Sequence, residues 1–327
     1  MNKSINSKNS FVKNKIIVKV IGGIGNQLFG LVFGLAVADK LRGALLIDDS
    51  LIPFGSNKTR LLEIRNIKVL GIPCKFKVKH AKKNRYLYNS LILRKIIWKL
   101  SVFKVNSEET TNNKGFRFKP NQKFFGYFQT WFYIDLLNNL GYKLSISDSN
   151  TSDSYKKVLH QVDFKNEVVV HVRLGDFLKF PEVYPKLPEF YYGESLAAIR
   201  KAKLKENYIL VAEDRREILE HYPKLYLNAK MIIDRTSGLS DFESFLLISK
   251  ANYLISSNST FSMWAAWMVK DNDGLVIVPD KNLFPLESQE LVDARWDKVD
   301  KITGLIYPGD FNFDDFLIKE ADFNAKF

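Results

Sequence analysis

The chain has 327 residues and a formal net charge of +13, with 46% hydrophobic and 26% charged residues. This length favours two domains, and the composition is that of an ordinary globular protein with enough apolar residues for a core. The single cysteine, Cys74, excludes an internal disulfide framework, and the four histidines are too scattered to indicate a metal site. Because we find no apolar run of about 18 residues that would span a membrane, we expect a cytoplasmic protein.

The positive charge is concentrated in residues 75–104, where ten Lys or Arg side chains occur without an acidic residue. Within this stretch, apolar and basic residues alternate at roughly helical spacing. A solvated basic face is the interpretation we favour, and peripheral contact with the anionic surface of the inner membrane is the alternative. Binding of nucleic acid is not expected, because no recognition fold or motif accompanies the charge.

The first element expected is a strand at 15–21, followed by the glycine turn GGIGNQLFG and an apolar helix at 31–41. Such a turn places backbone N–H groups and the positive end of a helix dipole where an anion can bind. Gly23 and Gly25 match the start of the dinucleotide fingerprint G-x-G-x-x-G, but Leu28 replaces its third glycine. An NAD-dependent oxidoreductase remains a minor alternative, because a carboxylate also follows the second strand.

Side-chain amides in two segments permit both a functional and a structural interpretation. Asn26 and Gln27 either bind hydroxyls and backbone groups or cap the helix that follows the glycine turn. The segment 123–134, KFFGYFQTWFYI, combines aromatic faces with Gln129, a combination used in sugar binding, although core packing is the commoner explanation. A polar loop at 145–154 and a short helical segment then lead to a domain boundary expected near residue 160.

The segment 168–177, VVVHVRLGDF, is the most informative part of the chain. Its three consecutive valines predict a buried strand of a parallel sheet, which ends in polar His171, Arg173 and Asp176. Ligands of open α/β sheets bind just beyond the carboxyl ends of the strands, so this cluster suits an anionic ligand. The alternative is a buried salt bridge between Arg173 and Asp176 that only shapes the loop.

Helices and strands alternate from here to residue 280, which predicts a parallel, doubly wound sheet. Three of its strands are followed by polar sequences, HVRLGD, AED and SNST, whose carboxyl ends share one edge of the sheet. In the last of these, Asn258, Ser259 and Thr260 precede an apolar helix. They either cap that helix or present hydroxyl and N–H groups to a phosphate, and we favour phosphate or nucleotide binding.

Several enzyme classes lack their motifs in this chain. There is no G-x-S-x-G elbow and no Walker loop, and the one D-x-D sequence, Asp271-Asn272-Asp273, has the composition of a turn. What remains is a two-domain α/β protein that can hold a diphosphate with an arginine and a helix N-terminus, without a metal ion. Arginine suits this task because its planar fork binds phosphate oxygens and keeps its charge.

Four motifs in order, GGIGNQLFG, GYFQ, HVRLGDF and SNSTFSMWAAW, resemble the α-1,2-fucosyltransferases of glycosyltransferase family 11. The resemblance extends from about Ile17 to Pro279. It implies a GT-B-like α/β fold, with two Rossmann-like domains facing across a cleft. It also implies GDP-fucose as donor, inversion at the fucose anomeric carbon, and no essential metal or other cofactor. The acceptor would be a galactose 2-hydroxyl of an oligosaccharide or lipid-linked glycan, in lipopolysaccharide O-antigen or a similar surface glycan.

The resemblance also implies roles for individual residues. Arg173 would stabilise the charge on the GDP leaving group, and His171 would position the diphosphate or the sugar. Asp176 would either accept the acceptor proton or brace Arg173. The remaining residues would bind the donor: Gly23, Asn26 and Gln27 from the N-terminal domain, and Glu213, Asp214, Asn258, Ser259, Thr260 and Ser262 from the C-terminal domain.

One departure from the family pattern bears on the donor. The family motif commonly reads H-x-R-R-G-D, and Leu174 stands here in place of the second arginine. This change implies weaker donor binding, another cation or a different donor, and it motivates the alternative of a nucleotide-sugar or glycan-binding protein without turnover. The expected organisation is a polar tail at 1–14, an N-terminal domain on the acceptor side at 15–160, a GDP-sugar-binding domain at 161–300 and a C-terminal tail at 301–327.

Overall fold

The computed structural model describes residues 15–52, 62–70, 77–79, 106–107, 118–119, 121–148, 150–203, 205–271, 274–280, 297–299 and 306–307. The expected tail at 1–14 lies outside these residues, as do most of the C-terminal tail and of the basic stretch at 75–104. Among the helices described, none has the length and apolar character needed to cross a membrane.

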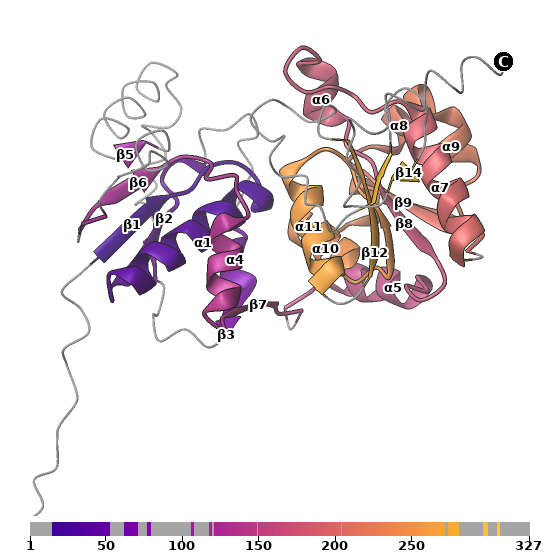
Figure 1. The fold of residues 1–327 in the computed structure, drawn as a ribbon. Helices are drawn as coiled ribbons and strands as arrows, with labels where there is room; N and C mark the ends of the chain where they lie inside the picture. Colours follow the sequence, from indigo (N-terminus) through magenta and orange to yellow (C-terminus); the bar gives the residue numbers. More distant parts are fainter. Residues whose placement is uncertain are drawn as a thin grey trace, which may run out of the picture. The chain divides into compact units, whose positions relative to one another are not determined.

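The chain divides into two compact units, Met1–Asn150 and Thr151–Phe327 (Figure 1). The boundary falls before the one expected at residue 160, because helix α5 (Asp153–Gln161) belongs to the second unit. The backbone N–H of Ser152, the N-cap residue of α5, donates to Glu243 Oε1 at 2.6 Å. This contact fixes the start of α5 to another element of the second unit.

The N-terminal unit contains a five-stranded sheet of order β4-β2-β1-β6-β5, in which every described pairing is parallel. A separate antiparallel pair, β3 with β7, was not expected from the sequence. The strands are β1 (Lys15–Lys19), β2 (Ala44–Asp48), β3 (Ile67–Leu70), β4 (Lys77–Lys79), β5 (Asn106–Ser107), β6 (Lys123–Phe125) and β7 (Lys143–Ile146). The helices are α1 (Ile24–Lys40), the 3-10 turn η2 (Ile64–Asn66) and α4 (Phe132–Asn139).

Helix α1 is buried along most of its length and packs closely on the sheet. A Cβ atom on Gly34 would lie 2.6 Å from Leu45 Cδ1 and 2.9 Å from Val18 Cγ2, so only glycine permits this approach. The helix begins at Ile24 rather than near residue 31, because residues of the glycine motif already form its first turns. The turn itself is confined to the residues around Gly22, whose φ of +79° favours glycine.

Aromatic side chains form much of the core of the N-terminal unit. Phe33 of α1 stacks on Phe128 at a centroid distance of 3.9 Å and meets Phe124 and Tyr133 edge to face. Both Phe124 and Phe128 are fully buried. The core-packing interpretation of the segment 123–134 is therefore confirmed for these rings.

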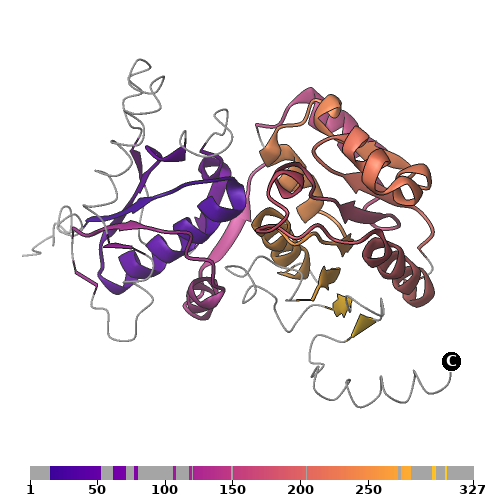
Figure 2. The same cartoon turned by 90° about the horizontal axis from the view of Figure 1, so that it is seen from above.

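The C-terminal unit is a seven-stranded sheet of order β10-β9-β8-β11-β12-β13-β14, parallel except for the last pair. Helices cover both of its faces, with α7, α8 and α9 on one side and α10 and α11 on the other (Figures 1 and 2). Its strands are β8 (Val168–His171), β9 (Tyr208–Val211), β10 (Met231–Ile233), β11 (Tyr253–Ile255), β12 (Leu275–Pro279), β13 (Asp297–Val299) and β14 (Ile306–Tyr307). Its further helices are α6 (Gly175–Lys179), α7 (Glu189–Lys203), α8 (Arg215–His221), α9 (Pro223–Leu227), the 3-10 turn η3 (Arg235–Ser237), α10 (Asp241–Ser249) and α11 (Thr260–Asp271).

The order in which strands are added to the sheet reverses at β8. From β8 the chain builds outward through β9 and β10, and it then returns to β11 on the other side of β8. Such a switch point opens a crevice outside the carboxyl ends of the strands, where α/β proteins bind their ligands. The predicted α/β fold with two Rossmann-like units is confirmed, and the GT-B-like arrangement of these units across a cleft stays a prediction.

Candidate functional site

Three neighbouring strands, β9, β8 and β11, bring their polar carboxyl ends together, as the sequence predicts. His171 is the last residue of β8, Glu213 follows β9, and Ser257 follows β11. Hydrogen bonds connect these ends directly, from Arg173 to Glu213 and between His171 and Ser257. The result is a polar edge with buried strands behind it.

Arg173 is surrounded by carboxylates at this edge. Its Nη1 donates a short hydrogen bond to Glu213 Oε1, and its Nη2 lies 3.5 Å from Asp176 Oδ2. The guanidinium of Arg235 also approaches, with Nη2 at 3.7 Å from the same Glu213 oxygen. The side chain of Arg173 is only 18% exposed, so it is held in one place while part of it still faces solvent.

Gly175 allows the loop after β8 to pass close to Glu213. Its φ is +33°, and a Cβ atom on it would lie 1.7 Å from Glu213 Oε2. Its backbone N–H donates to Glu217 Oε2 at 3.1 Å, which fixes the loop to helix α8. The glycine is therefore required for the pairing of Arg173 with Glu213.

His171 is buried and uncharged. Its Nδ1 lies 3.2 Å from Ser257 Oγ, and its ring lies 5.2 Å from that of Phe261. Burial, and secondarily the positive charge of Arg173, lowers the pKa of His171 to about 3. The imidazole is neutral near pH 7 and can position a ligand without adding charge.

The turn between β11 and α11 is held by a network of serine hydroxyls. Ser262 is fully buried, and its Oγ accepts from the Ser257 N–H at 2.9 Å and lies 2.7 Å from Ser256 Oγ. Ser259 Oγ accepts from the Ser262 N–H at 3.2 Å, which is the capping role given above as the alternative to phosphate binding. Ser262, which we expected to bind the donor, therefore stabilises the turn through its contacts with Ser256 and Ser257.

The other residues of the turn differ in exposure. Asn258 is buried, and its Nδ2 donates to the carbonyl oxygen of Pro185 at 2.8 Å, so it ties the turn to the loop before α7. Ser259 and Thr260 are half-buried. They are the members of the predicted set in this turn whose side chains are open to solvent.

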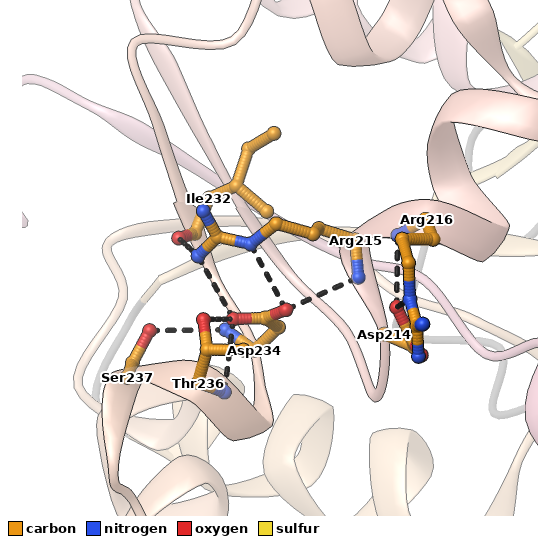
Figure 3. Close-up of polar contacts among 7 residues, drawn as sticks. All are labelled: Asp214, Arg215, Arg216, Ile232, Asp234, Thr236 and Ser237. Atoms are coloured by element: carbon orange, nitrogen blue, oxygen red, sulfur yellow. Dashed lines mark hydrogen bonds and ion pairs between the residues drawn. The ribbon is translucent and has the colours of Figure 1, made fainter.

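Asp214 faces a different direction from Glu213. It caps helix α8 by accepting from the Arg216 N–H at 2.9 Å, and it also pairs with the Arg216 guanidinium at 2.7 Å (Figure 3). Its predicted role in donor binding gains no support from this position. These two adjacent acidic residues therefore have different arginine partners, and the sequence did not indicate which of them joins Arg173.

The predicted residues of the N-terminal unit make their hydrogen bonds with other residues of the same unit. Gln27 is buried, donates to the carbonyl oxygen of Gly22 at 3.0 Å and accepts from the Glu63 N–H at 2.8 Å. Asn26 Oδ1 accepts from Gln129 Nε2 at 3.0 Å, which joins the motifs GGIGNQLFG and GYFQ. Gly23 is the N-cap residue of α1, and the start of this helix has no capping hydrogen bond from a side chain. Neither amide therefore has the capping role given as the alternative.

Leu174 does not face the polar edge. It is 3% exposed and packs in the apolar core of the C-terminal unit. The sequence analysis missed Arg235, Glu217 and Ser257 as members of the site. The sequence could have indicated them, because each of the three follows the carboxyl end of a parallel strand within about six residues. Within the described parts of the chain, no three His, Cys, Asp or Glu residues are grouped so as to hold a metal ion.

Comparison with known proteins places the chain in a family. The description "Glycosyl transferase family 11" matches residues 8–296, which is most of the chain. The chain belongs to this family. It is therefore a glycosyltransferase, and the four motifs named above lie within the matched residues.

Two curated relatives from Escherichia coli match this chain over almost their whole length. An alpha-1,2-colitosyltransferase is 23% identical over 299 residues, which cover 88% of this chain and 99% of the relative. The O-antigen biosynthesis glycosyltransferase WbnK is 26% identical over 303 residues, which cover 84% of this chain and 97% of the relative. Among solved structures, the fucosyltransferase NodZ from Bradyrhizobium is 14% identical with a TM-score of 0.42, over 78% of this chain and 93% of that one.

Proposed function

We propose that this family 11 glycosyltransferase transfers L-fucose from GDP-fucose to the 2-hydroxyl of a galactose in a glycan acceptor. The reaction inverts the anomeric carbon, needs no metal ion and serves the synthesis of lipopolysaccharide O-antigen or a similar surface glycan. The names of the two relatives support this proposal, because one forms an α-1,2 linkage and the other acts in O-antigen biosynthesis.

The observation that carries the proposal is the position of Arg173 at the switch point of the C-terminal sheet. A partly exposed arginine follows β8 there, and His171 at the end of the same strand contacts Ser257 in the turn that leads to the N-terminus of α11 at Thr260. A guanidinium keeps its charge and binds phosphate oxygens in a planar fork. The serine turn adds the backbone N–H groups and the helix dipole that favour an anion.

The chemistry assigned to these groups is a single displacement at the sugar. The bond between the anomeric carbon and the phosphate oxygen breaks, and the acceptor oxygen forms the new bond from the opposite face. The negative charge that develops on the GDP diphosphate is stabilised by Arg173, which needs no reorganisation because Glu213 already orients it. Neutral His171 positions the diphosphate or the sugar.

The acceptor hydroxyl must lose its proton, and we assign Asp176 as the base. Glu213 is hydrogen-bonded to Arg173 and also lies 3.7 Å from Arg235, so we assign it as the brace, whereas Asp176 Oδ2 lies 3.5 Å from Arg173 Nη2, at the limit of a hydrogen bond. Asp176 is also in the first turn of α6, 28% exposed, where an acceptor can approach it. It would take the acceptor proton as the new glycosidic bond forms.

A second donor is favoured by one specific observation. One of the two relatives is named a colitosyltransferase, and colitose is a fucose that lacks its 3-hydroxyl. The two donors would share the GDP moiety and differ at one hydroxyl. A direct comparison of both donors therefore belongs in the first experiment.

The experiment incubates the chain with GDP-fucose or GDP-colitose and a panel of β-galactosides, with EDTA present. It follows release of GDP and assigns the linkage of the product by NMR. Formation of an α-1,2-linked product with EDTA present supports the proposed linkage and metal independence together. GDP binding without turnover on any acceptor would instead favour the non-catalytic binder, and binding of a nicotinamide cofactor at the first glycine turn would favour the oxidoreductase.

A further inference from the structure

Arg235 follows β10 at the same edge of the sheet as Arg173, and it lies outside the four motifs named above. We propose that Arg235 is a second phosphate-binding cation of the donor site, opposite Arg173. The inference rests on the proposed function, because it assumes a nucleoside diphosphate sugar as donor. It assigns to Arg235 the charge that Leu174, buried in the core, does not supply.

The two arginines meet at a single carboxylate oxygen. Arg173 Nη1 and Arg235 Nη2 both approach Glu213 Oε1, from β8 and from the end of β10 respectively. The two guanidinium charges face the Glu213 carboxylate, and the Asp176 carboxylate, 3.5 Å from Arg173 Nη2, balances the remaining charge. A guanidinium carries five N–H donors; Glu213 and Asp176 occupy only some of those of Arg173, and the contact of Arg235 with Glu213 is longer than a hydrogen bond. The remaining donors are available to the oxygens of a diphosphate.

The backbone holds Arg235 in this position. Its N–H donates to the Glu213 carbonyl oxygen at 3.4 Å, and it begins the 3-10 turn η3, which Asp234 caps through a capping box. Asp234 also accepts hydrogen bonds from Arg215 and Thr236 (Figure 3). Burial acts to raise the pKa of Asp234, but these hydrogen bonds lower it to about 2, so the anchor keeps its charge.

The two neighbouring arginines are hydrogen-bonded to carboxylates, whereas the guanidinium of Arg235 contacts Glu213 only at a longer distance. The side chain of Arg215 donates two hydrogen bonds to Asp234, and Arg216 pairs with Asp214 at 2.7 Å. The side chain of Arg235 is 67% exposed, and its contact with Glu213, at 3.7 Å, is longer than a hydrogen bond. Of these three arginines, Arg235 loses the least when it turns toward a ligand.

The test compares Arg235→Ala and Arg235→Lys with the wild-type chain, with Arg200→Ala as the matched control. Arg200 is similarly exposed and also paired with a glutamate, but it lies near the end of α7, at the amino edge of the sheet. Calorimetry with GDP and with inorganic pyrophosphate measures the dissociation constants at low salt. We expect Arg235→Ala to weaken the binding of GDP and of pyrophosphate by about tenfold, as expected for the loss of a charged hydrogen bond.

Arg235→Lys should recover part of the affinity, because the charge remains without the planar fork, and Arg200→Ala should bind like the wild type. Equal binding by Arg235→Ala and the wild type overturns the inference, even if fucosyl transfer is observed. Weakened binding in Arg235→Ala, in a chain that transfers neither sugar, supports the inference while the proposed reaction fails. The two failures are thus distinguishable.

Discussion

Arg173 is the residue on which the chemistry of the site depends most. It is the arginine closest to both carboxylates at the switch point, and its position is fixed by Glu213 and by the turn at Gly175. A fixed positive charge in a partly buried site stabilises an anionic leaving group more strongly than the same charge in water.

Replacement of Arg173 by Ala should therefore abolish measurable transfer, with a fall in kcat of about 10²- to 10³-fold as for other preorganised charge stabilisers. Melting of the variant should stay close to that of the wild type, because Arg235 remains beside Glu213. Arg173→Lys, which keeps the charge, tests whether the fork itself matters. Retained activity in the alanine variant would remove Arg173 from its proposed role.

Asp176→Asn separates the two roles open to this carboxylate. A general base contributes about 10²- to 10⁴-fold to the rate, so kcat should fall by that amount while the affinity for GDP changes little. A brace would behave differently, since its loss would weaken GDP binding through Arg173.

At the scale of single residues, the sequence predicted where the site lies better than what each residue does. His171, Arg173 and Asp176 follow a run of valines, and this position alone placed them at the edge of a buried strand. The roles of Glu213 and Asp214 depend on which way consecutive side chains point after the strand. No pattern in the sequence carried that information.

At the scale of elements, the loop from β8 to α6 is the feature that builds the site. Gly175→Ala should disturb it, because the added Cβ would collide with Glu213 Oε2 at a backbone angle that disfavours any other residue. We expect a loss of about 1–2 kcal/mol in the free energy of unfolding, from backbone strain and displacement of the carboxylate. Transfer should fall with it, because Arg173 would lose its brace.

Gly193→Ala is the matched control for this prediction. Gly193 is exposed within helix α7, and a Cβ atom there would meet nothing within 4 Å. Alanine should stabilise the helix by about 1 kcal/mol and leave transfer unchanged. Both free energies are measurable by denaturant unfolding. A Gly175→Ala variant as active and stable as the wild type would show that the loop tolerates the larger residue.

The elements of the C-terminal unit were the more predictable ones. Alternating apolar strands and helices from β8 to β12 follow a regular pattern, and the structure confirms each of them. In the N-terminal unit, the antiparallel pair β3–β7 joins segments far apart in the chain, and no local signal indicates such a pairing. Helix α1 begins earlier than expected because its glycines pack against the sheet rather than break the helix.

At the scale of the whole molecule, the stability of the C-terminal unit should depend on pH through His171. The pKa of this residue is lowered from its usual 6.5 to about 3 in the folded unit, so the unfolded chain binds a proton that the folded unit does not. Stability is therefore highest above pH 6.5 and falls as the pH decreases toward 3. Between pH 6.5 and pH 5 the loss should be about 2 kcal/mol.

Hydrogen exchange of the β8 amides measures this loss in the C-terminal unit alone. His171→Gln removes the titrating group and should flatten the dependence over the same pH range. An equally steep dependence in this variant would assign the effect to other groups, such as Asp234, whose lowered pKa acts only nearer pH 2 to 4.

The division into two α/β units, each built on a parallel sheet, was predictable from length and from the alternation of elements. The position of the boundary between them was not. The short helix α5 looks like a linker in sequence, and only the contact of Ser152 with Glu243 shows to which unit it belongs. The expected basic stretch at 75–104 lies largely outside the described residues, and its contact with a membrane stays a prediction.

The most direct test of the central claim is a crystal structure of the chain with GDP. We predict that the diphosphate lies at the carboxyl edge of β8, β9 and β11, within hydrogen-bond distance of Arg173 and facing the turn from Ser257 to Thr260. A diphosphate bound only at the glycine turn before α1, with Arg173 still paired only with Glu213 and Asp176, would contradict the claim.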